Sequence, residues 1–346
     1  MRFLVDILHP AHVHFFRNFI GEMERRGHSF LVTARDKEIA LDLLRAYGIP
    51  HQVLSRQRRG PGLAAELALR AARLWRLARR FAPDYLLGIM GPAIALAGKA
   101  LPSRTVIFYD TEMARATNWF SYPLADLVCT PDCYQGDAGA HQLRYPGYHE
   151  LAYLHPRRFT PRREVLARNG LDDGRPVHLV RFVSWQASHD VGERGWSAAG
   201  KRRVVELLAA RGHVLVSSEA ALPPDLAPHR SRVPVEDLHH VLAFADLLVG
   251  ESATMASEAA VLGTHALFVS RTGRGYTDEE ERRYGLVHNF THQQEDAALQ
   301  RIEALLARPD LKADALRRRE RLLADKIDVT GWMVELFESG LAARAA

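Results

Sequence analysis

The feature that most constrains the fold is a regular alternation of apolar, strand-like runs with segments of helical spacing. In the first half, the runs RFLVDIL, SFLVTA, DYLLGIM and RTVIFYD are separated by helical patterns, one of which covers residues 15–26. The second half repeats this plan with PVHLVRFV, HVLVSS, DLLVGE and THALFVS. Strands separated by helices predict βαβ units, and therefore parallel sheets with helices on their faces.

The chain of 346 residues is long enough for two such domains. A polar stretch rich in Pro, Gly and charge, HPRRFTPRREVLARNGLDDGRP, separates the two halves. We therefore predict an α/β protein with two Rossmann-like domains whose parallel sheets face across a cleft. The expected organisation is a first domain over 1–157, a linker over 158–175, a second domain over 176–325, and a C-terminal helix in 326–346 that packs back on the first domain.

The composition is that of a globular protein, with 47% hydrophobic and 25% charged residues. Cys129 and Cys133 are its two cysteines, so a disulfide framework is excluded and we expect a reducing, cytoplasmic location. The first residues have the pattern of a strand and not of a signal peptide, and no run of 18 or more residues lacks charge. The net charge of +5 favours anionic partners, but no nucleic-acid motif occurs, so we expect no nucleic-acid binding.

The most informative stretch is ADLLVGESATMASEAAVLG, in which a buried strand ends at Gly250 and a helix begins near Met255. Small residues and hydroxyls at a strand-to-helix turn let backbone N–H groups and the helix dipole hold a phosphate, which makes Ser252 and Thr254 candidates for phosphate binding. Glu258 follows about one turn later, about 5.4 Å along the axis, where a carboxylate can bind ribose hydroxyls. The alternative is that both hydroxyls only cap the helix and Glu258 is a solvated acid of its first turn.

This stretch, with the preceding VPVEDLHHVLAFA, resembles the donor-binding motif of the GT-B glycosyltransferases, and among related enzymes it is similar to the non-hydrolysing UDP-N-acetylglucosamine 2-epimerase. The resemblance implies that Ser252 contacts a diphosphate and Glu258 a ribose, although Ser-Ala-Thr stands where those families have Ser-Gly-Gly or Ser-Gly-Ala. Through DILHPAHVHFF, YPGYHELAYLHP and RFVSWQASHD, nearly the whole chain also resembles the domain of unknown function 354 family of predicted glycosyltransferases. The resemblance implies a GT-B fold.

Two further loops are expected to face the same ligand. RFVSWQASHD follows the first strand of the second domain and offers Ser184 and His189 as donors to the diphosphate, the alternative being a turn with cap residues. RTGRGYTDEEERRYG offers Arg271, whose guanidinium suits a phosphate, the alternative being a solvated loop.

The first loop, ILHPAHVHFF, places His9, His12 and His14 after the first strand. Their spacing matches no zinc motif, so we expect no metal there. His14, beside two phenylalanines, is expected to be buried. In the lipid II N-acetylglucosaminyltransferase, which this chain resembles, a histidine of the first loop is thought to serve the reaction. We therefore expect His12, followed by His9, to act as a base, since a histidine with a pKa of about 6.5 can accept a hydroxyl proton at cellular pH.

Asp110, the last residue of RTVIFYD, and Glu112, two positions later, are the second candidates for a catalytic base, expected on one face of the strand end. Glu112 loosely matches a glutamate that follows a similar strand in the epimerase. The alternative is that either carboxylate caps the next helix. Asp-Thr-Glu is not the Asp-x-Asp signature of metal-dependent glycosyltransferases, so we expect an enzyme that needs neither a metal nor a cofactor.

The segment 63–81 has the pattern of a basic amphipathic helix, with Leu67 and Leu74 on one face and arginines, including Arg70, largely on others. Such a helix can lie on an anionic membrane. The alternative is a crossover helix packed on the sheet with a solvated arginine face.

We therefore predict a metal-independent glycosyltransferase that moves a sugar from a nucleotide-sugar donor, a UDP-sugar, to a hydroxyl of a glycan or lipid-linked acceptor in surface glycan or polysaccharide synthesis. Peripheral contact with the inner face of the membrane through 63–81 belongs to this prediction. A non-hydrolysing UDP-sugar 2-epimerase is one alternative, and a non-catalytic nucleotide-binding protein is another.

Overall fold

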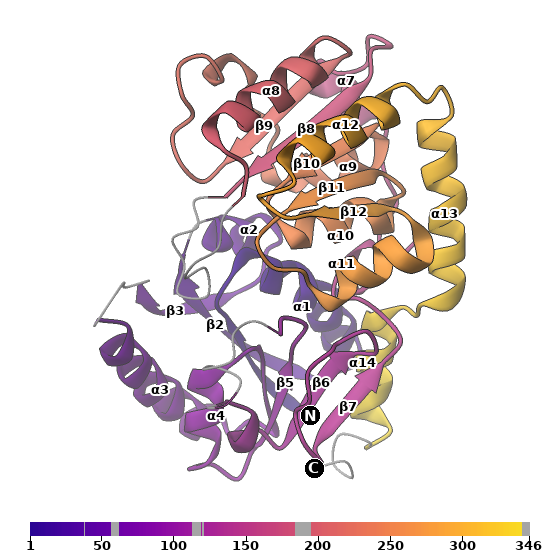
Figure 1. The fold of residues 1–346 in the computed structure, drawn as a ribbon. Helices are drawn as coiled ribbons and strands as arrows, with labels where there is room; N and C mark the ends of the chain where they lie inside the picture. The colour runs from indigo at the N-terminus through magenta and orange to yellow at the C-terminus, as the bar shows by residue number, and fades with distance from the viewer. Residues whose placement is uncertain (38, 57–61, 113–118, 120, 184–194, 341–346) are drawn as a thin grey trace. The chain divides into compact units, whose positions relative to one another are not determined.

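The strands form two separate parallel sheets, each interleaved with helices (Figure 1), which confirms the predicted α/β class. The computed structural model describes residues 1–37, 39–56, 62–112, 119, 121–183 and 195–340. The chain divides into two compact units, unit 1 being Met1–Arg158 with Ile327–Ala346, and unit 2 being Phe159–Lys326.

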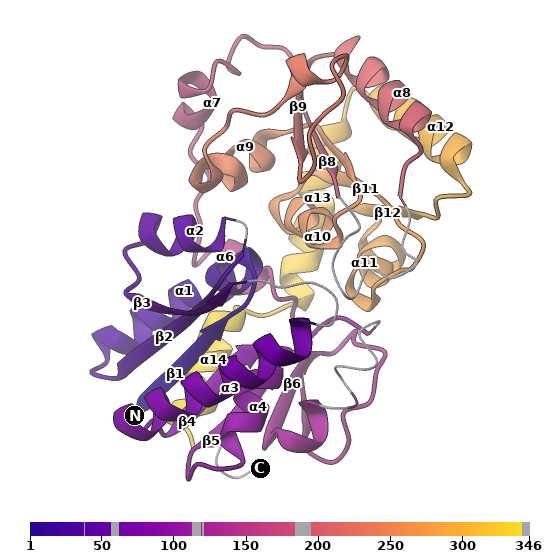
Figure 2. The ribbon, with the colours of Figure 1, turned by 90° about the vertical axis from the view of Figure 1, so that its left-hand side faces the viewer.

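The sheet of unit 1 has seven parallel strands in the order β3-β2-β1-β4-β5-β6-β7. These strands are β1 (Arg2–Ile7), β2 (Ser29–Asp36), β3 (His51–Arg56), β4 (Tyr85–Ile89), β5 (Arg104–Phe108), β6 (Leu127–Pro131) and β7 (Gln142–Tyr145). The helices are α1 (Pro10–Arg25), α2 (Ala40–Ala46), α3 (Gly62–Phe81), α4 (Pro92–Gly98), the short η1 (Tyr122–Leu124), α6 (Leu151–Leu154) and α14 (Val329–Glu338). Figure 2 shows α3 and α4 over one face of this sheet and α1 and α14 over the other.

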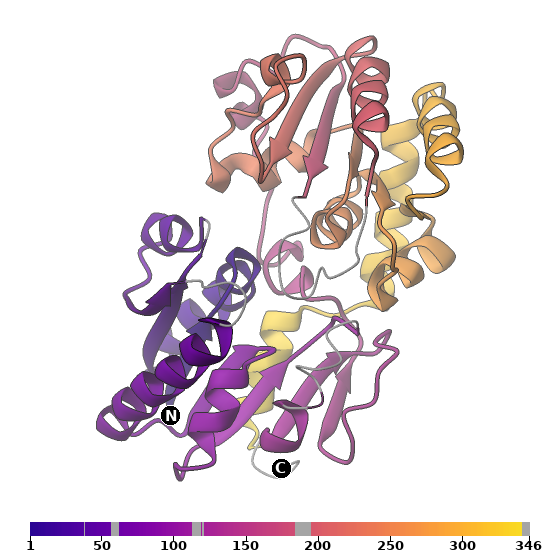
Figure 3. The ribbon, with the colours of Figure 1, turned by 60° about the vertical axis from the view of Figure 1, so that its left-hand side comes forward.

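The sheet of unit 2 has five parallel strands in the order β12-β11-β10-β8-β9. These strands are β8 (Val177–Phe182), β9 (His213–Ser218), β10 (Leu247–Gly250), β11 (His265–Val269) and β12 (Val287–Phe290). The helices are α7 (Glu164–Arg168), α8 (Ala198–Ala209), η2 (Ala227–His229), η3 (Val235–Asp237), α9 (Leu238–Phe244), α10 (Ala253–Leu262), α11 (Gly275–Glu279), η4 (Glu280–Tyr284), α12 (Glu295–Leu306) and α13 (Leu311–Asp325). Figures 2 and 3 show α8 and α12 side by side on one face, where both contribute to the apolar core of the unit.

The strand order fixes where a ligand can bind in each unit. In unit 1 the order reverses between β1 and β4, and in unit 2 it reverses between β8 and β10. Open parallel sheets bind ligands outside the carboxyl ends of their strands, at this switch point. Ligand-binding residues are therefore expected in the loops at these switch points, such as those after β1, β8 and β10.

The C-terminal helix α14 packs in the core of unit 1. The ring of Phe337 lies 5.2 Å from that of Phe3 and 4.9 Å from that of Tyr85, centroid to centroid. The backbone N–H of Ile327 donates to the carbonyl of Pro146 at 3.0 Å. The chain thus leaves unit 1 after Arg158 and returns to it at Ile327.

The segment 158–175, which the sequence predicts to be a linker, is folded as part of unit 2 from Phe159 onward. Val165 and Leu166 form the buried side of the short helix α7, which packs beside α9. This part of the segment is therefore folded into unit 2 and is not a linker.

Helix α3 buries a face that the sequence pattern does not indicate. Glu66, Arg70, Leu74 and Ala78 are buried, whereas Leu69 is 46% exposed. The expectation that Arg70 lies on a solvated face is therefore wrong. Its guanidinium donates from Nε to Asp6 Oδ2 at 3.2 Å and pairs with Asp6 Oδ1, so a buried carboxylate near the end of β1 holds it against the sheet.

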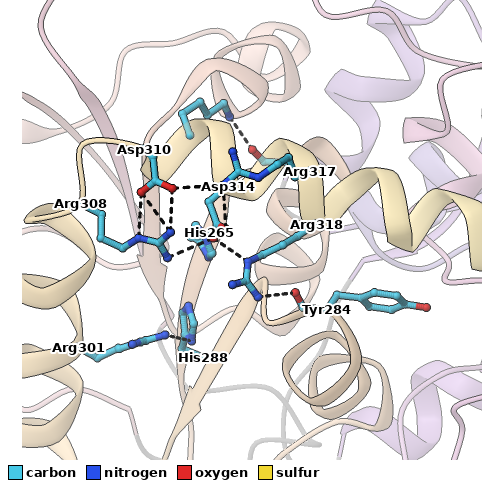
Figure 4. A network of polar contacts seen from close by, with 11 residues as sticks. His265, Tyr284, His288, Arg301, Arg308, Asp310, Asp314, Arg317 and Arg318 are labelled. Atoms are coloured by element: carbon cyan, nitrogen blue, oxygen red, sulfur yellow. Dashed lines mark hydrogen bonds and ion pairs between the residues drawn. The ribbon is translucent and has the colours of Figure 1, made fainter.

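Unit 2 carries a charged network around Asp314 of α13 (Figure 4). Its Oδ2 accepts from Nε of Arg318 at 2.7 Å and from Nη1 of Arg308 at 3.2 Å, and lies 3.2 Å from Nε2 of His265 in β11. Arg318 also donates to the carbonyl of Tyr284 at 3.1 Å. One carboxylate thus ties α13 to the start of β11.

Within the described ranges, the structure contains no helix with the length and hydropathy that a membrane crossing requires.

Candidate functional site

In unit 1, three polar side chains follow strands at the carboxyl edge of the sheet. His12 lies in the first turn of α1, after β1; Asp110 follows β5; and His149 follows β7. Asp110 and His149 both act electrostatically on His12. Parallel strands present all their carboxyl ends at one edge, so loops far apart in the sequence bring these three groups into one region.

His9 and His12 are fixed by hydrogen bonds at the start of α1. His9 is the N-cap residue, and its Nδ1 accepts from the backbone N–H of Ala11 at 3.2 Å. Nδ1 of His12 accepts from the backbone N–H of Leu8 at 3.3 Å. A neutral imidazole whose Nδ1 accepts carries its proton on Nε2. Both rings therefore have an Nε2–H group, which is a hydrogen-bond donor.

His12 is neutral at cellular pH. Its side chain is buried, and burial, with a further contribution from the charge of Lys37, lowers the pKa of His12 to about 3. His14 is buried, as expected, with its ring 5.2 Å from that of Tyr153 and 5.8 Å from that of Tyr47. The ring of His14 thus packs against tyrosines, whereas the rings of His9 and His12 lie beside each other, with centroids 6.0 Å apart.

Asp110 forms an ion pair with a histidine that the sequence analysis did not single out. Its Oδ2 lies 3.0 Å from Nδ1 of His149, and its Oδ1 accepts from the hydroxyl of Thr111 at 2.9 Å. His149 is buried against Phe15, with ring centroids 4.6 Å apart. Its Nε2 is also buried, and no described residue hydrogen-bonds to it. The signal for His149 was its place directly after the last strand of the first half, in the stretch YPGYHE.

Glu112 has a different partner from Asp110. Its Oε1 accepts from the backbone N–H of Gln135 at 3.2 Å, at the surface. The two carboxylates are therefore engaged separately, and Asp110 is the one that faces the histidines.

In unit 2, the strand-to-helix turn after β10 has the expected form. Ser252 is the N-cap of α10, and its hydroxyl accepts from the backbone N–H of Met255 at 3.3 Å. Thr254, half-buried, lies in the first turn of the same helix. The capping alternative therefore describes what the Ser252 hydroxyl does in this structure, and the helix N-terminus follows the β10 strand at the switch point of the sheet.

Glu258 is not a solvated acid. It is 5% exposed, and its Oε1 lies 2.9 Å from Nε2 of His239 in α9. The solvated alternative is therefore wrong, because α9 packs beside α10 and covers this carboxylate. His239, in the stretch VEDLHHVLAFA, was missed as a partner, since sequence spacing does not show which helix lies next to α10.

Glu251 anchors the loop that follows β8. Its buried carboxylate accepts from the backbone N–H of Val183 at 2.7 Å and of Trp196 at 2.8 Å, and it pairs with Nζ of Lys201 at 3.2 Å. Burial raises the pKa of Glu251, although the charge of Lys201 opposes this. Gly195 is required beside it, because a Cβ there would lie 2.2 Å from Glu251 Oε1. The sequence pattern around Glu251, between the end of the strand at Gly250 and Ser252, does not indicate this role.

The remaining candidates are the loop residues Ser184, His189 and Arg271. Ser184 and His189 lie outside the described residues, between the two backbone groups that Glu251 binds. Arg271 is exposed and follows β11, the neighbour of β10. The structure therefore places Arg271 at the same edge as Ser252.

Comparison with known proteins agrees with this architecture. Residues 1–172 match the model of the family described as protein of unknown function (DUF354), which confirms the predicted resemblance over that region. An uncharacterized protein from Methanocaldococcus jannaschii is 24% identical over 286 residues, which cover 75% of this chain and 79% of that protein.

Solved structures of GT-B proteins are similar over almost the whole chain. One is UDP-GlcNAc 2-epimerase from Neisseria meningitidis bound to UDP-GlcNAc, at 12% identity and a TM-score of 0.68, covering 98% of this chain and 100% of the other. Another is MurG from Acinetobacter baumannii, at 15% identity and a TM-score of 0.61, with the same coverage. The chain therefore has the GT-B fold, as predicted.

Proposed function

We propose that this protein is a glycosyltransferase that uses a nucleotide-sugar, a UDP-sugar, as its donor and a hydroxyl group as its acceptor. The observation that carries the proposal is the turn after β10, where a capped helix N-terminus is followed by the buried carboxylate of Glu258. These features support the proposal that one helix offers a site for an anion and a site for hydroxyl groups. A GT-B protein of similar structure contains bound UDP-GlcNAc, which supports this choice of ligand class.

The donor contacts follow from the geometry of α10. Glu258 lies four positions after Thr254 on α10, which corresponds to a rise of about 6 Å along a helix. The N–H groups at the start of α10, with Ser252 and Thr254, would hold the diphosphate, and Arg271 would add charge from the next loop. Glu258 would accept hydrogen bonds from the ribose hydroxyls, and His239 would hold its carboxylate in position.

We propose that the loop after β8 also contributes to the donor site, because β8 is the second strand of the switch point. Glu251 holds both backbone ends of the segment that contains Ser184 and His189. We propose that these two side chains meet the diphosphate, because the segment starts at the carboxyl end of β8, the strand that pairs with β10.

The acceptor would bind at the carboxyl edge of unit 1. The loop after β1 offers the Nε2–H donors of His9 and His12, and the loops after β5 and β7 offer Asp110 and His149. Glu112 remains a second candidate in the acceptor site. This arrangement combines donors that can orient an acceptor with an acid–base pair, and the proposed reaction needs no metal.

The acceptor is proposed to be a glycan or a lipid-linked sugar. Helix α3 supports a contact with an anionic membrane surface, because its outer face exposes apolar and basic side chains together. Leu63 is 36% exposed and Leu69 46% exposed. The basic side chains on the exposed surface of α3 are Arg73, Arg76, Arg79 and Arg80.

A UDP-sugar 2-epimerase is the second candidate. It is favoured by the TM-score of 0.68 with the Neisseria meningitidis epimerase, against 0.61 with MurG. Against it, the stretch SHDVGERG keeps only the histidine of that enzyme's His-Arg-Arg-Glu-Asn loop.

The two candidates give different products from the same donor. Incubation with UDP-GlcNAc, followed by ¹H NMR, would show UDP and a new glycoside in the presence of a suitable acceptor if the protein is a transferase. An epimerase would instead convert the donor to its C2 epimer without any acceptor. A wild-type protein that binds UDP and forms only the epimer would refute the transferase proposal.

A further inference from the structure

We propose that His149, held by Asp110, is the general base that removes the proton of the acceptor hydroxyl. This inference rests on the proposed transferase function and deepens it, because it names the residue that does the acid–base chemistry in unit 1. It differs from the expectation drawn from the sequence, in which His12 has this role.

The orientation of the His149 ring decides which nitrogen is basic. Nδ1 faces the carboxylate of Asp110 at 3.0 Å, and a carboxylate is an acceptor only. The neutral ring therefore keeps its proton on Nδ1, and Nε2 has a free lone pair. This is the tautomer that a general base requires, with a carboxylate on one nitrogen and an open acceptor on the other.

His12 has the opposite tautomer. Its Nδ1 accepts from the backbone N–H of Leu8, so the proton is on Nε2. The lone pair of His12 is thus occupied and its other nitrogen can only donate. Its pKa of about 3 agrees with a ring that stays neutral during the reaction. His12 is therefore suited to orient an oxygen atom of the substrate, whereas His149 is suited to accept a proton.

The surroundings of Nε2 of His149 agree with this role. This atom is buried and has no hydrogen-bond partner among the described residues. Buried polar atoms are almost always hydrogen-bonded in folded proteins, so an exception requires an explanation. A donor supplied by a bound substrate, the acceptor hydroxyl, satisfies Nε2 and accounts for the exception.

Asp110 is well placed to hold the ring. Its two oxygens have different donors, His149 on Oδ2 and the hydroxyl of Thr111 on Oδ1. This fixes the plane of the carboxylate and, through it, the direction of Nε2. Phe15 packs against the same ring and limits its rotation. Asp110 is thus a positioning residue, and its charge stabilises the imidazolium when His149 is protonated.

The step balances without any further reagent. The acceptor oxygen forms a bond to C1 of the donor sugar while the bond from C1 to the diphosphate oxygen breaks. The proton of the acceptor hydroxyl passes to Nε2 of His149, and the electron pair of the broken bond leaves with the nucleoside diphosphate. The imidazolium then returns its proton to water.

The first test reads the tautomer in the full-length protein without any ligand. Protein labelled with ¹⁵N-histidine is measured by two-dimensional ¹H–¹⁵N NMR at neutral pH, and the His149 signals are assigned by their absence in His149→Gln. We expect a proton on Nδ1 and an unprotonated Nε2 for His149, and the reverse for His12. In Asp110→Asn we expect the His149 signals to change while those of His12 persist. A proton on Nε2 of wild-type His149 would overturn the assignment, whatever the donor is.

The second test measures release of UDP from UDP-GlcNAc, with water and simple glycosides as acceptors. We expect His149→Gln to lower turnover about 100-fold or more while leaving the Kd for UDP unchanged. His51→Gln, a half-buried histidine at the start of β3, is the matched control and should keep wild-type turnover. Turnover of His149→Gln within threefold of wild type would overturn the inference. A wild-type protein that does not bind UDP would instead contradict the proposed function itself.

Discussion

Replacing Arg70 with Met tests the packing that supports the candidate site in unit 1. Arg70 is 2% exposed and Asp6 is fully buried, and the two form an ion pair beneath the sheet. Arg70 also donates to the hydroxyl of Ser55 at 3.0 Å and to the carbonyl of Ala34 at 3.3 Å. Arg70→Met would leave the carboxylate of Asp6 with the hydroxyl of Thr33, at 2.6 Å, as its described side-chain hydrogen-bond partner.

The expected cost follows from this burial. Removing one partner of a buried ion pair costs about 3–5 kcal/mol, because the remaining charge stays in the interior. For a unit of this size, 1 kcal/mol corresponds to about 2–4 °C in Tm, so we expect a shift of about 10 °C. The double variant Asp6→Leu with Arg70→Met should recover most of the loss, because it leaves no buried charge.

Differential scanning calorimetry would measure these shifts, with the transition of unit 1 followed separately from that of unit 2. Arg76→Met, on the exposed surface of the same helix, is the matched control and should change Tm little. If Arg70→Met melted within 1 °C of Arg76→Met, the reasoning from burial would be refuted. The reasoning would also be refuted if the double variant were as unstable as Arg70→Met alone.

Two further predictions concern unit 2. Burial alone would raise the pKa of Asp314. Hydrogen bonds and charge from Arg318 and Arg308 outweigh burial and lower this pKa to about 2. Because this pKa is depressed below the unfolded value of about 3.9, the stabilisation is present above that pH and is lost as the pH falls through 2. The gap in Tm between wild type and Asp314→Asn should therefore close between about pH 4 and pH 2, and a constant gap would contradict this; Asp296→Asn, exposed on α12, is the control. Glu251→Ala should speed amide hydrogen exchange at Val183 and Trp196 and weaken binding of UDP, because both N–H groups lose their acceptor; unchanged exchange would contradict the anchoring role.

Local sequence pattern was sufficient for much of the fold and for the strand-to-helix turn of the proposed donor site. The alternation of apolar runs and helical spacing predicted both parallel sheets, because each βαβ unit is specified by contiguous residues. The spacing of Ser252 and Glu258 could be predicted because Ser252 caps the helix that carries Glu258, so it depends on that helix alone.

The parts that escaped prediction depend on contacts between distant segments. His149 reaches Asp110 only because β7 and β5 end at the same edge of the sheet, and His239 reaches Glu258 only because α9 packs beside α10. The burial of Arg70 has the same origin, since its partner lies on β1. No spacing rule within one segment contains this information. A histidine or arginine near a predicted strand end therefore has to be judged against carboxylates at the ends of the other strands.

The central claim, that α10 binds a nucleotide-sugar donor, is tested most directly by calorimetric titration of UDP into wild type and Glu258→Gln. Gln keeps the shape of the side chain and an acceptor for His239 but loses the charge. A hydrogen bond to a charged group contributes about 1.5–3 kcal/mol, so we expect the Kd for UDP to rise about 10- to 100-fold. Glu303→Gln, exposed on α12, is the matched control and should bind as wild type does. Binding of UDP to wild type with this loss in Glu258→Gln is the result that the account predicts. Absence of binding by wild type, or equal binding by wild type and Glu258→Gln, would contradict it.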